Sequence, residues 1–482
     1  MRILFVYPNV TRATCPQLGI CMLAATAKQL GHGCALYDLT SIRPGKEIFA
    51  FQSQLNSSVA DVLAVSCRSN EWSFVDTLLR SVDVGNILKI FGGPHATVAP
   101  EEVIGLADIV VLGEGEETFA ELLKRIAGGG DIANVAGCWI KQGGGIIKNE
   151  MRNLISDLDE LPFPSWEIFD GVHYYDSCRK TLFKGAKVVG TFEGSRGCPY
   201  ACTYCINDEV RTLYKGKGKW RREKSPERIV QEVAQFREQY GLDGVFWADE
   251  VFLTNVERLE RFRDLYRSQI GVPFGFMERP ENMTDEKIRI IKEAGAQMVS
   301  IGIESGDENI RRNLLNRHHS QETIVSAFRT ARKYGLTTHA FTMTGFPGED
   351  KRSMEDTYRL VRQAQPDTVQ TTIFYPLRGT KLFELVVQGG FLDSSTPMPN
   401  TYYGESSLTL PERQKKELIR HQYLVTYYNS RMMRLFVRAH LGQFFLRLLA
   451  LFFRVSTKFR QEGIRSTLKA IARRIRILRV KS

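Results

Sequence analysis

The stretch Cys198-Pro199-Tyr200-Ala201-Cys202-Thr203-Tyr204-Cys205 places three thiols within eight residues, at the spacing C-x3-C-x2-C. Gly197 and Pro199 predict that this segment is a loop. Thiolates are soft ligands, so three on one loop suit either an iron–sulfur cluster or zinc. Zinc would need a fourth Cys or His nearby, and none follows before His318. A 4Fe-4S cluster normally takes four cysteines, so three would leave one iron open to a small molecule. The remaining alternative is three buried, inert cysteines.

The spacing, with Tyr204 directly before Cys205, resembles the radical S-adenosylmethionine (SAM) superfamily. This resemblance implies that Cys198, Cys202 and Cys205 hold a 4Fe-4S cluster whose open iron chelates the amino and carboxylate groups of SAM. It also implies that one electron cleaves SAM to methionine and a 5′-deoxyadenosyl radical.

From Val188 onward, apolar strand patterns alternate with helical patterns for six units, which predicts a parallel α/β fold. Six units are too few for a closed eight-stranded barrel, so the sequence predicts a partial (βα)6 barrel. The predicted strands are Val188–Phe192, Gly244–Trp247, Phe274–Met277, Met298–Ile303, Thr337–Met343 and Thr368–Tyr375.

Polar residues follow several of these strands, where the chemistry of parallel βα barrels gathers. Asp249 and Glu250 follow the second strand, Arg279 the third, and Glu304 and Ser305 the fourth. The resemblance implies that Asp249 and Glu250 help hold the SAM amino group. It implies that Arg279 pairs with the SAM carboxylate, for which a guanidinium has suitable geometry. Glu304 and Ser305 resemble the contacts to the SAM amine and ribose. Without the resemblance, Asp249 and Glu250 would be interpreted as solvated loop acids.

Residues 1–150 also alternate strands and helices, which predicts a Rossmann-like domain with a parallel sheet. No G-x-G-x-x-G follows the first strand, so a dinucleotide site is not expected. The predicted strands are Ile3–Tyr7, Cys34–Asp38, Val62–Ser66, Ile87–Phe91 and Ile109–Leu112.

Two motifs of this region, Gly92–Thr97 and Gly113–Thr118, resemble the amino-terminal domain of the cobalamin-binding radical SAM family. The resemblance implies a cobalamin module. The chain has no D-x-H-x-x-G motif, so no cobalt ligand is assigned, and His95 is either the nearest candidate by motif or a polar turn residue. A module that has kept the fold and lost the cofactor is the alternative. The predicted cobalamin contacts are Ser66, Gly92, Gly93, His95, Gly113 and Glu114.

The 482 residues, 43% hydrophobic and 25% charged, indicate two or three soluble domains. The expected division is a cobalamin-binding domain (1–150), a connector (151–187), the radical SAM barrel (188–400) and a helical region (401–482). Nine cysteines in so long a chain do not indicate a secreted disulfide framework, so a reducing cytoplasm is expected.

The net charge of +11 is concentrated in the carboxyl-terminal tail. From Arg413 onward, 18 Lys and Arg face 2 acids, or +16, which leaves 47 minus 52, or −5, for the remainder. The tail combines an apolar helical pattern (441–455) with a basic amphipathic one (464–479), which favours peripheral association with the inner face of a membrane. Packing within the protein, dimerisation and RNA binding are alternatives. Nucleic acid is not favoured, because the aromatic residues Phe444, Phe445, Phe452 and Phe453 lie in the apolar pattern and not in the basic one.

Together these features predict a cobalamin-dependent radical SAM C-methyltransferase acting on an unactivated carbon of a hydrophobic or natural-product-type small molecule. The family logic also implies an electron donor such as flavodoxin or ferredoxin. The alternative within the same fold is oxidative cyclisation without methyl transfer, as in tetrapyrrole-pathway relatives. RNA methylthiolation and a non-catalytic cobalamin sensor are further alternatives.

Overall fold

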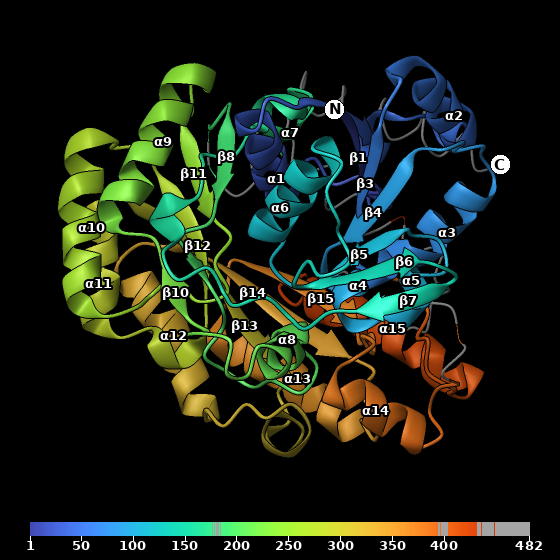
Figure 1. Ribbon diagram of the computed structural model, residues 1–482. Helices are drawn as coiled ribbons and strands as arrows, with labels where there is room; N and C mark the ends of the chain where they lie inside the picture. Colours follow the sequence, from blue (N-terminus) through green and yellow to red (C-terminus); the bar gives the residue numbers. More distant parts are fainter. Residues whose placement is uncertain are drawn as a thin grey trace.

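The computed structural model describes residues 1–430 apart from 176, 178, 180–182, 184, 394–395 and 397–402, and after 430 only residues 435 and 448. Two mainly parallel sheets, each packed against helices, lie side by side (Figure 1). This confirms the predicted α/β class, with a Rossmann-like domain followed by a partial barrel. The boundaries at 150, 187 and 400 stay predictions.

The first sheet has seven strands in the order β2-β1-β3-β4-β5-β6-β7. β1 to β5 are parallel and match the five predicted strands. β6 and β7 form an antiparallel hairpin that the sequence analysis did not predict, with Gly143 and Gly144 at positive φ in its turn. The strands are β1 (Arg2–Tyr7), β2 (Gly33–Asp38), β3 (Val62–Ser66), β4 (Leu88–Gly92), β5 (Ile109–Val111), β6 (Cys138–Gln142) and β7 (Gly145–Lys148).

Both faces of this sheet are buried, because side chains alternate across a strand. In β1, Phe5 packs with Phe119 of α6 on one face, whereas Leu4 and Val6 pack with Phe51 of α2 on the other. The helices are α1 (Leu18–Gln29), α2 (Glu47–Ser58), α3 (Trp72–Arg80), α4 (Pro94–Val98), α5 (Pro100–Val103) and α6 (Glu116–Ala127).

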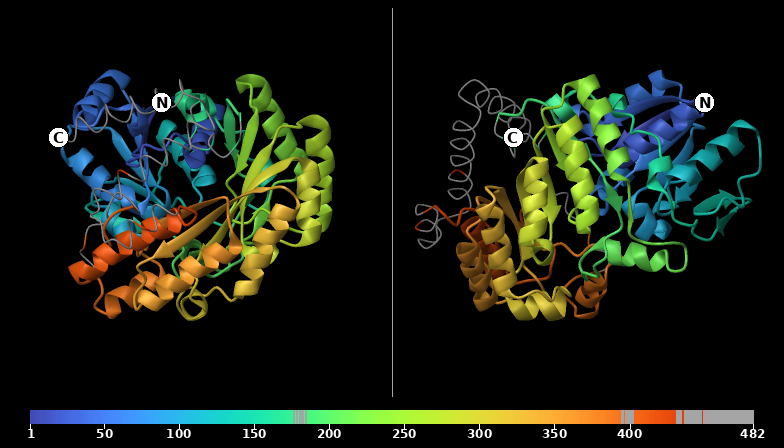
Figure 2. Two further views of the ribbon diagram at one scale, coloured as in Figure 1. Left: turned by 180° about the vertical axis from the view of Figure 1, so that it is seen from behind. Right: turned by 90° about the vertical axis from the view of Figure 1, so that its left-hand side faces the viewer.

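The second sheet has six parallel strands in the order β15-β14-β13-β12-β11-β8. β8 and β15 form its two edges in the part of the chain that the structure describes, so the predicted partial barrel is confirmed. Helices cover its outer face (Figure 2). The strands are β8 (Val189–Phe192), β11 (Gly244–Trp247), β12 (Phe274–Glu278), β13 (Ala296–Glu304), β14 (Thr337–Thr344) and β15 (Thr368–Ile373). The helices are α9 (Pro226–Tyr240), α10 (Val256–Gln269), α11 (Asp285–Ala294), α12 (Gln321–Lys333), α13 (Lys351–Ala364) and α14 (Lys381–Gln388).

The start of each helix from α9 to α13 is fixed by a side-chain cap. Each capping residue has extended or near-extended backbone, and its side-chain oxygen accepts the amide N–H three residues later. Such a cap satisfies a helix donor that would otherwise lack a partner and sets where the preceding loop ends. The caps are Ser225, Asn255, Thr284, Ser320 and Asp350.

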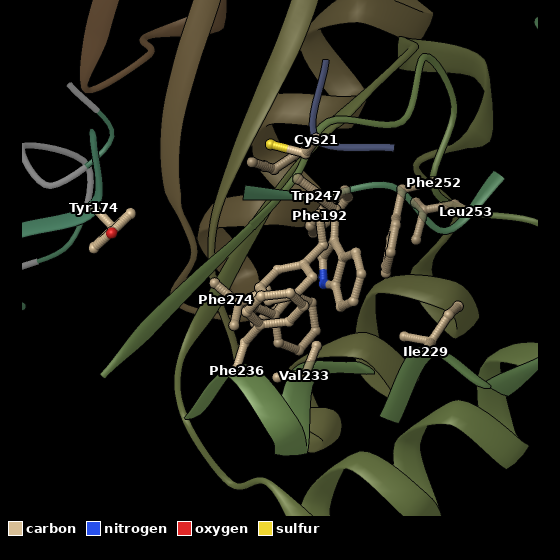
Figure 3. Packing of buried hydrophobic residues seen from close by; sticks show 14 of the residues in the cluster. Cys21, Tyr174, Phe192, Ile229, Val233, Phe236, Trp247, Phe252, Leu253 and Phe274 are labelled. Atoms are coloured by element: carbon tan, nitrogen blue, oxygen red, sulfur yellow. The ribbon is translucent and has the colours of Figure 1, made fainter. Parts of the chain in front are cut away.

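An aromatic core lies between the outer helices and strands β8, β11 and β12 (Figure 3). The ring centroids of Phe192 and Trp247 are 5.7 Å apart, and Phe236 of α9 lies 5.8 Å from Phe192. Phe252, just after β11, stacks 5.6 Å from Trp247. Buried aromatic residues dominate core energetics, so this packing fixes the ends of the strands that carry the predicted site.

The last described helix, α15 (Glu412–Thr426), packs on β15. Gln422 Nε2 donates to Thr371 O at 2.9 Å. The apolar (441–455) and basic (464–479) tail segments lie outside the described residues, so membrane association through them stays a prediction. Within the described ranges, no helix has the length and apolar character that crossing a membrane requires.

The loop after β13 is pressed against α13, which generates a stability prediction. A Cβ added to Gly306 would lie 2.2 Å from Asp356 O. Gly306→Ala is therefore expected to lower the free energy of unfolding by about 1–3 kcal/mol, the usual cost of overpacking. Gly145→Ala, whose added Cβ would be 3.9 Å from its nearest neighbour, is the matched control. Equal denaturation midpoints for the two variants would contradict this packing.

Candidate functional site

The cysteine loop runs from β9 (Ser195–Arg196) to α8 (Ile206–Leu213). Trp220 Nε1 donates to Cys198 O at 2.8 Å, and Asn316 Nδ2 donates to Ala201 O at 2.7 Å. Cys205 N donates to Cys202 O at 3.1 Å within the loop. These bonds hold the backbone at three points, so the cysteines are presented on a fixed loop.

Burial raises the pKa of Cys198, and it raises the pKa of Cys205 to about 12. Both are therefore protonated thiols at neutral pH, and metal binding would release their protons. No three His, Cys, Asp or Glu side chains form a preassembled metal site in the described part of the chain. The donor set nevertheless fits an iron–sulfur cluster. Three soft ligands share one loop, and Arg279 Nη1 donates to Cys202 Sγ at 3.0 Å.

Arg279 lies between the end of β12 and the cysteine loop. Its Nε and Nη2 contact Glu281 Oε1 at 2.8 and 2.6 Å, and its guanidinium stacks on the Tyr200 ring at 3.6 Å. The predicted SAM-carboxylate ligand thus already has a carboxylate partner. Its remaining Nη1 faces the Cys202 sulfur.

Asp249 and Glu250 follow β11 as predicted, but their environments differ. Asp249 is buried, and its carboxylate accepts from Gly194 N at 3.0 Å and from Ser195 Oγ. Burial raises the pKa of Asp249 to about 6. Glu250 is exposed, with Asn207 Nδ2 3.5 Å from its Oε1.

Glu304 ends β13 with φ of 64°, a left-handed conformation that is uncommon outside glycine. Arg317 Nη1 lies 3.5 Å from Glu304 Oε1 and 3.2 Å from the Tyr204 hydroxyl oxygen. Arg317 therefore links this strand end to the cysteine loop. Sequence reasoning missed it because it lies in a loop without a recognised motif. Ser305 is fully buried, and its Oγ accepts from Asp307 N at 3.2 Å.

The first sheet carries a cleft of about 250 Å³ at the carboxyl ends of β3, β4 and β5. Ser66, Gly92, Gly93, Gly113 and Glu114 line it, which brings together five of the six predicted cobalamin contacts. Glycine is required at Gly93, where φ is 91° and a Cβ would lie 2.8 Å from Ser66 Oγ. The cleft therefore fits a group that must approach the backbone closely.

His95 is not among the residues that line this cleft. It is buried in α4, with its ring 5.0 Å from the ring of Trp72. Its Nδ1 lies 3.2 Å from Ser69 Oγ, and its Nε2 lies 3.7 Å from Glu102 Oε2. Burial, reinforced by Arg378, lowers the pKa of His95 to about 4. The sequence motif predicts that His95 contacts the cofactor in the cleft. In the structure, however, α4 directs the His95 ring against the ring of Trp72.

Two family models match the chain. The radical SAM superfamily model matches residues 192–361, and the B12 binding domain model matches residues 7–123. An uncharacterized methyltransferase of Pyrococcus horikoshii is 27% identical over 405 residues, which cover 81% of this chain and 84% of that protein. Cytidylyl-2-hydroxyethylphosphonate methyltransferase of Streptomyces wedmorensis is 25% identical over 388 residues (73% and 71%). Anaerobic magnesium-protoporphyrin IX monomethyl ester cyclase of Cereibacter sphaeroides is 24% identical over 406 residues (80% and 63%).

Two solved structures share the fold. The methyltransferase TsrM from Kitasatospora setae, with cobalamin and a [4Fe-4S] cluster bound, has a TM-score of 0.62 at 16% identity, covering 82% of this chain and 79% of its own. OxsB, with aqua-cobalamin and SAM bound, has a TM-score of 0.66 at 14% identity, covering 99% and 75%. The fold and site thus define a B12-binding domain joined to a radical SAM barrel. The chain belongs to the radical SAM enzymes that carry an amino-terminal B12-binding domain.

The raised pKa of Asp249 generates a pH prediction. Its value of about 6 exceeds the ordinary 3.8, so the folded state binds this proton more tightly than the unfolded chain does. Its contribution to stability is therefore full below pH 3.8 and is lost as the pH rises through 6. Asp249→Asn should make the fall in unfolding free energy across this range shallower.

The measurement is urea unfolding at several pH values. Asp264→Asn is the control, because the Asp264 side chain is 63% exposed. Identical slopes for wild type and Asp249→Asn would show that the carboxyl carries no such proton.

Proposed function

We propose that the enzyme is a cobalamin-dependent methyltransferase that adds a methyl group to an unactivated carbon of a hydrophobic or natural-product-type small molecule. The observation that carries this proposal is the shared position of the two predicted cofactor sites. Arg196 lines the cleft of the B12-binding domain, and it stands two residues before Cys198 of the radical SAM loop. A methyl carrier and a SAM-cleaving cluster would therefore lie on either side of one wall.

The proposed cluster ligands are Cys198, Cys202 and Cys205. The proposed SAM contacts are Asp249, Glu250, Arg279, Glu304 and Ser305, and the proposed corrinoid contacts are Ser66, Gly92, Gly93, Gly113 and Glu114. When bound, the cluster supplies the electron that cleaves SAM and the corrinoid supplies the methyl group. Arg279 and Arg317 place fixed positive charge around the cysteine loop. Positive charge there suits the binding of a carboxylate beside the open iron.

The relatives favour methyl transfer over the cyclase alternative. The proteins of P. horikoshii and S. wedmorensis are named methyltransferases, whereas that of C. sphaeroides is a cyclase. S-adenosylhomocysteine separates the two, because methyl transfer should release it together with 5′-deoxyadenosine. RNA methylthiolation would need a second cluster held by amino-terminal cysteines, and Cys21 and Cys67 are buried in separate hydrophobic clusters.

A reducing cytoplasm suits the free thiols of the cysteine loop, and flavodoxin or ferredoxin is the proposed class of electron donor. Peripheral attachment to the inner face of a membrane, through the tail segments 441–455 and 464–479, is a separate hypothesis. Its test is sedimentation with anionic liposomes before and after removal of residues 441–482.

Cys198→Ala tests the cluster assignment. The variant, reconstituted without oxygen, should lose the iron–sulfur absorption and form no 5′-deoxyadenosine from SAM under strong reductant, because the cluster would lack one of its three ligands. Cys34→Ala, at a half-buried thiol on β2, should retain both. Wild-type yields of 5′-deoxyadenosine from Cys198→Ala would refute the assignment.

Leu23→Trp tests the cobalamin cleft. Leu23 of α1 lines the cleft, so a larger side chain should fill it and abolish the visible absorption of bound hydroxocobalamin after gel filtration. Leu385→Trp, at a side chain that is 51% exposed on α14, is the control. Undiminished binding by a folded Leu23→Trp protein would place the corrinoid elsewhere.

A further inference from the structure

Two arginines on one short ribbon join the two domains. Arg196 of β9 and Arg222 of β10 (Arg222–Glu223) are register partners in a two-stranded antiparallel sheet. The Nη2 and Nη1 of Arg222 contact Glu114 Oε1 and Oε2 at 2.6 and 2.8 Å. Nη1 also donates to Ile155 O at 2.7 Å, and the side chain is 5% exposed. This two-pronged contact, called the fork below, fixes both the distance and the orientation of the Arg222 guanidinium relative to the Glu114 carboxylate.

Arg196 extends the same cluster. Its Nη2 donates to Glu116 Oε1 at 2.6 Å and its Nε to Glu193 Oε1 at 2.8 Å, while Nη1 lies 3.6 Å from Glu114 Oε1. Burial opposes ionisation of Glu116, but the Arg196 guanidinium outweighs it and lowers the pKa of that carboxyl. Two guanidinium groups thus bind three carboxylates, of which Glu114 and Glu116 belong to the first domain. Removal of one partner would leave a buried charge without compensation.

The turn after β5 fits closely against the second domain. Glu114 N donates to the Tyr214 hydroxyl oxygen at 2.7 Å. At Gly113, where φ is 73°, a Cβ would lie 1.9 Å from that same oxygen. The sequence motif predicts Gly113 and Glu114 as cofactor contacts, and both do line the cleft. Glu114, however, pairs with Arg222 and donates its N–H to Tyr214, both in the radical SAM domain, whereas Gly113 N donates to Thr97 Oγ1 at 3.0 Å within the first domain.

The ion-pair cluster also forms a wall of the cleft, which Glu114, Glu116 and Arg196 all line. Among the residues that the structure describes, Nη1 of Arg196 makes only the 3.6 Å contact to Glu114, so it has N–H donors for a further acceptor at this wall. The periphery of a corrinoid carries carboxamides, whose carbonyl oxygens are suitable acceptors.

Toward the carboxyl terminus, Arg196 leads directly into the cysteine loop. Gly197 alone separates it from Cys198, and a Cβ at Gly197 would lie 2.2 Å from Trp220 O. Trp220 Nε1 donates to Cys198 O at 2.8 Å, and Arg221 Nη1 donates to Gly197 O at 3.2 Å. The ribbon therefore carries the cleft wall and the first cysteine on one rigid support.

We propose that Arg196 is a positioning residue that, together with Arg222, fixes the distance between the corrinoid and the cysteine-bound cluster. This inference rests on the proposed function, since it requires both cofactors to bind. The methyl donor and the radical must reach the same substrate carbon, and a misplacement of about 1 Å can cost about a hundredfold in rate. We therefore expect the reaction rate to depend more on a fixed distance between the two sites than on the affinity of either site for its cofactor.

The experiment uses full-length enzyme reconstituted with iron, sulfide and hydroxocobalamin. Arg222→Gln removes the fork without altering a residue that lines the cleft. We expect unchanged iron content and about tenfold weaker hydroxocobalamin binding, a size typical of coupling between sites. In paramagnetic resonance spectra of the reduced enzyme, the interaction between the cob(II)alamin and cluster spins should weaken, because it falls steeply with distance. Arg196→Lys should show the same change in spin interaction.

Arg261→Gln is the matched control, since Arg261 pairs with Glu227 on the exposed outer face of the barrel. If Arg222→Gln does not fold, Arg222→Lys gives the same readouts, because it also leaves every residue that lines the cleft unchanged. Hydroxocobalamin affinity and spin interaction equal to wild type in a folded variant would overturn the inference alone. Failure of the wild-type enzyme to bind hydroxocobalamin would overturn the proposed function, and the inference with it.

Discussion

The fork between Arg222 and Glu114 is the contact on which the arrangement of the two sites depends. Apolar packing also holds the two sheets together, because one hydrophobic cluster contains Phe5 of the first sheet, Trp166 of the connector and Phe192 of the second sheet. The charged pairs add a fixed orientation, since a buried carboxylate is tolerated only where its partner has suitable geometry. The neighbouring Arg196 adds the same requirement at Glu116. The result is a fixed arrangement of the cysteine loop and a cleft that is lined by Arg196 and by residues between Phe5 and Phe119.

Both proposed cofactor sites follow the rule for parallel sheets, in which ligands bind beyond the carboxyl ends of the strands. The cleft lies after β3, β4 and β5, and the cysteine loop, Asp249, Arg279 and Glu304 follow strands of the barrel. The cleft and the cysteine loop meet at the β9–β10 ribbon, because Arg196 lines the cleft and stands two residues before Cys198. This shared position distinguishes the enzyme from a simple fusion of two independent domains.

The strand ends show where motif reasoning was sufficient and where it was not. The motifs located Asp249, Arg279 and Glu304 at strand ends, as the structure has them. They did not show that Asp249 is buried under Gly194 and Ser195, or that Arg279 is already paired with Glu281. Arg317 and Arg196 were missed altogether. A motif records residue type and spacing, whereas these contacts join positions that are distant along the chain.

The sequence by itself determined the class of fold, all eleven strands of the parallel repeats to within two residues at each end, and the three cysteines of the loop. Alternating hydrophobicity and clustered thiols are local patterns, so they can be read without knowledge of the neighbours. Tertiary structure alone decided that His95 packs away from the cleft, that Gly113 and Glu114 contact the second domain, and that Arg196 lies at the cleft. Those outcomes depend on the docking of one sheet against the other, which local patterns do not encode.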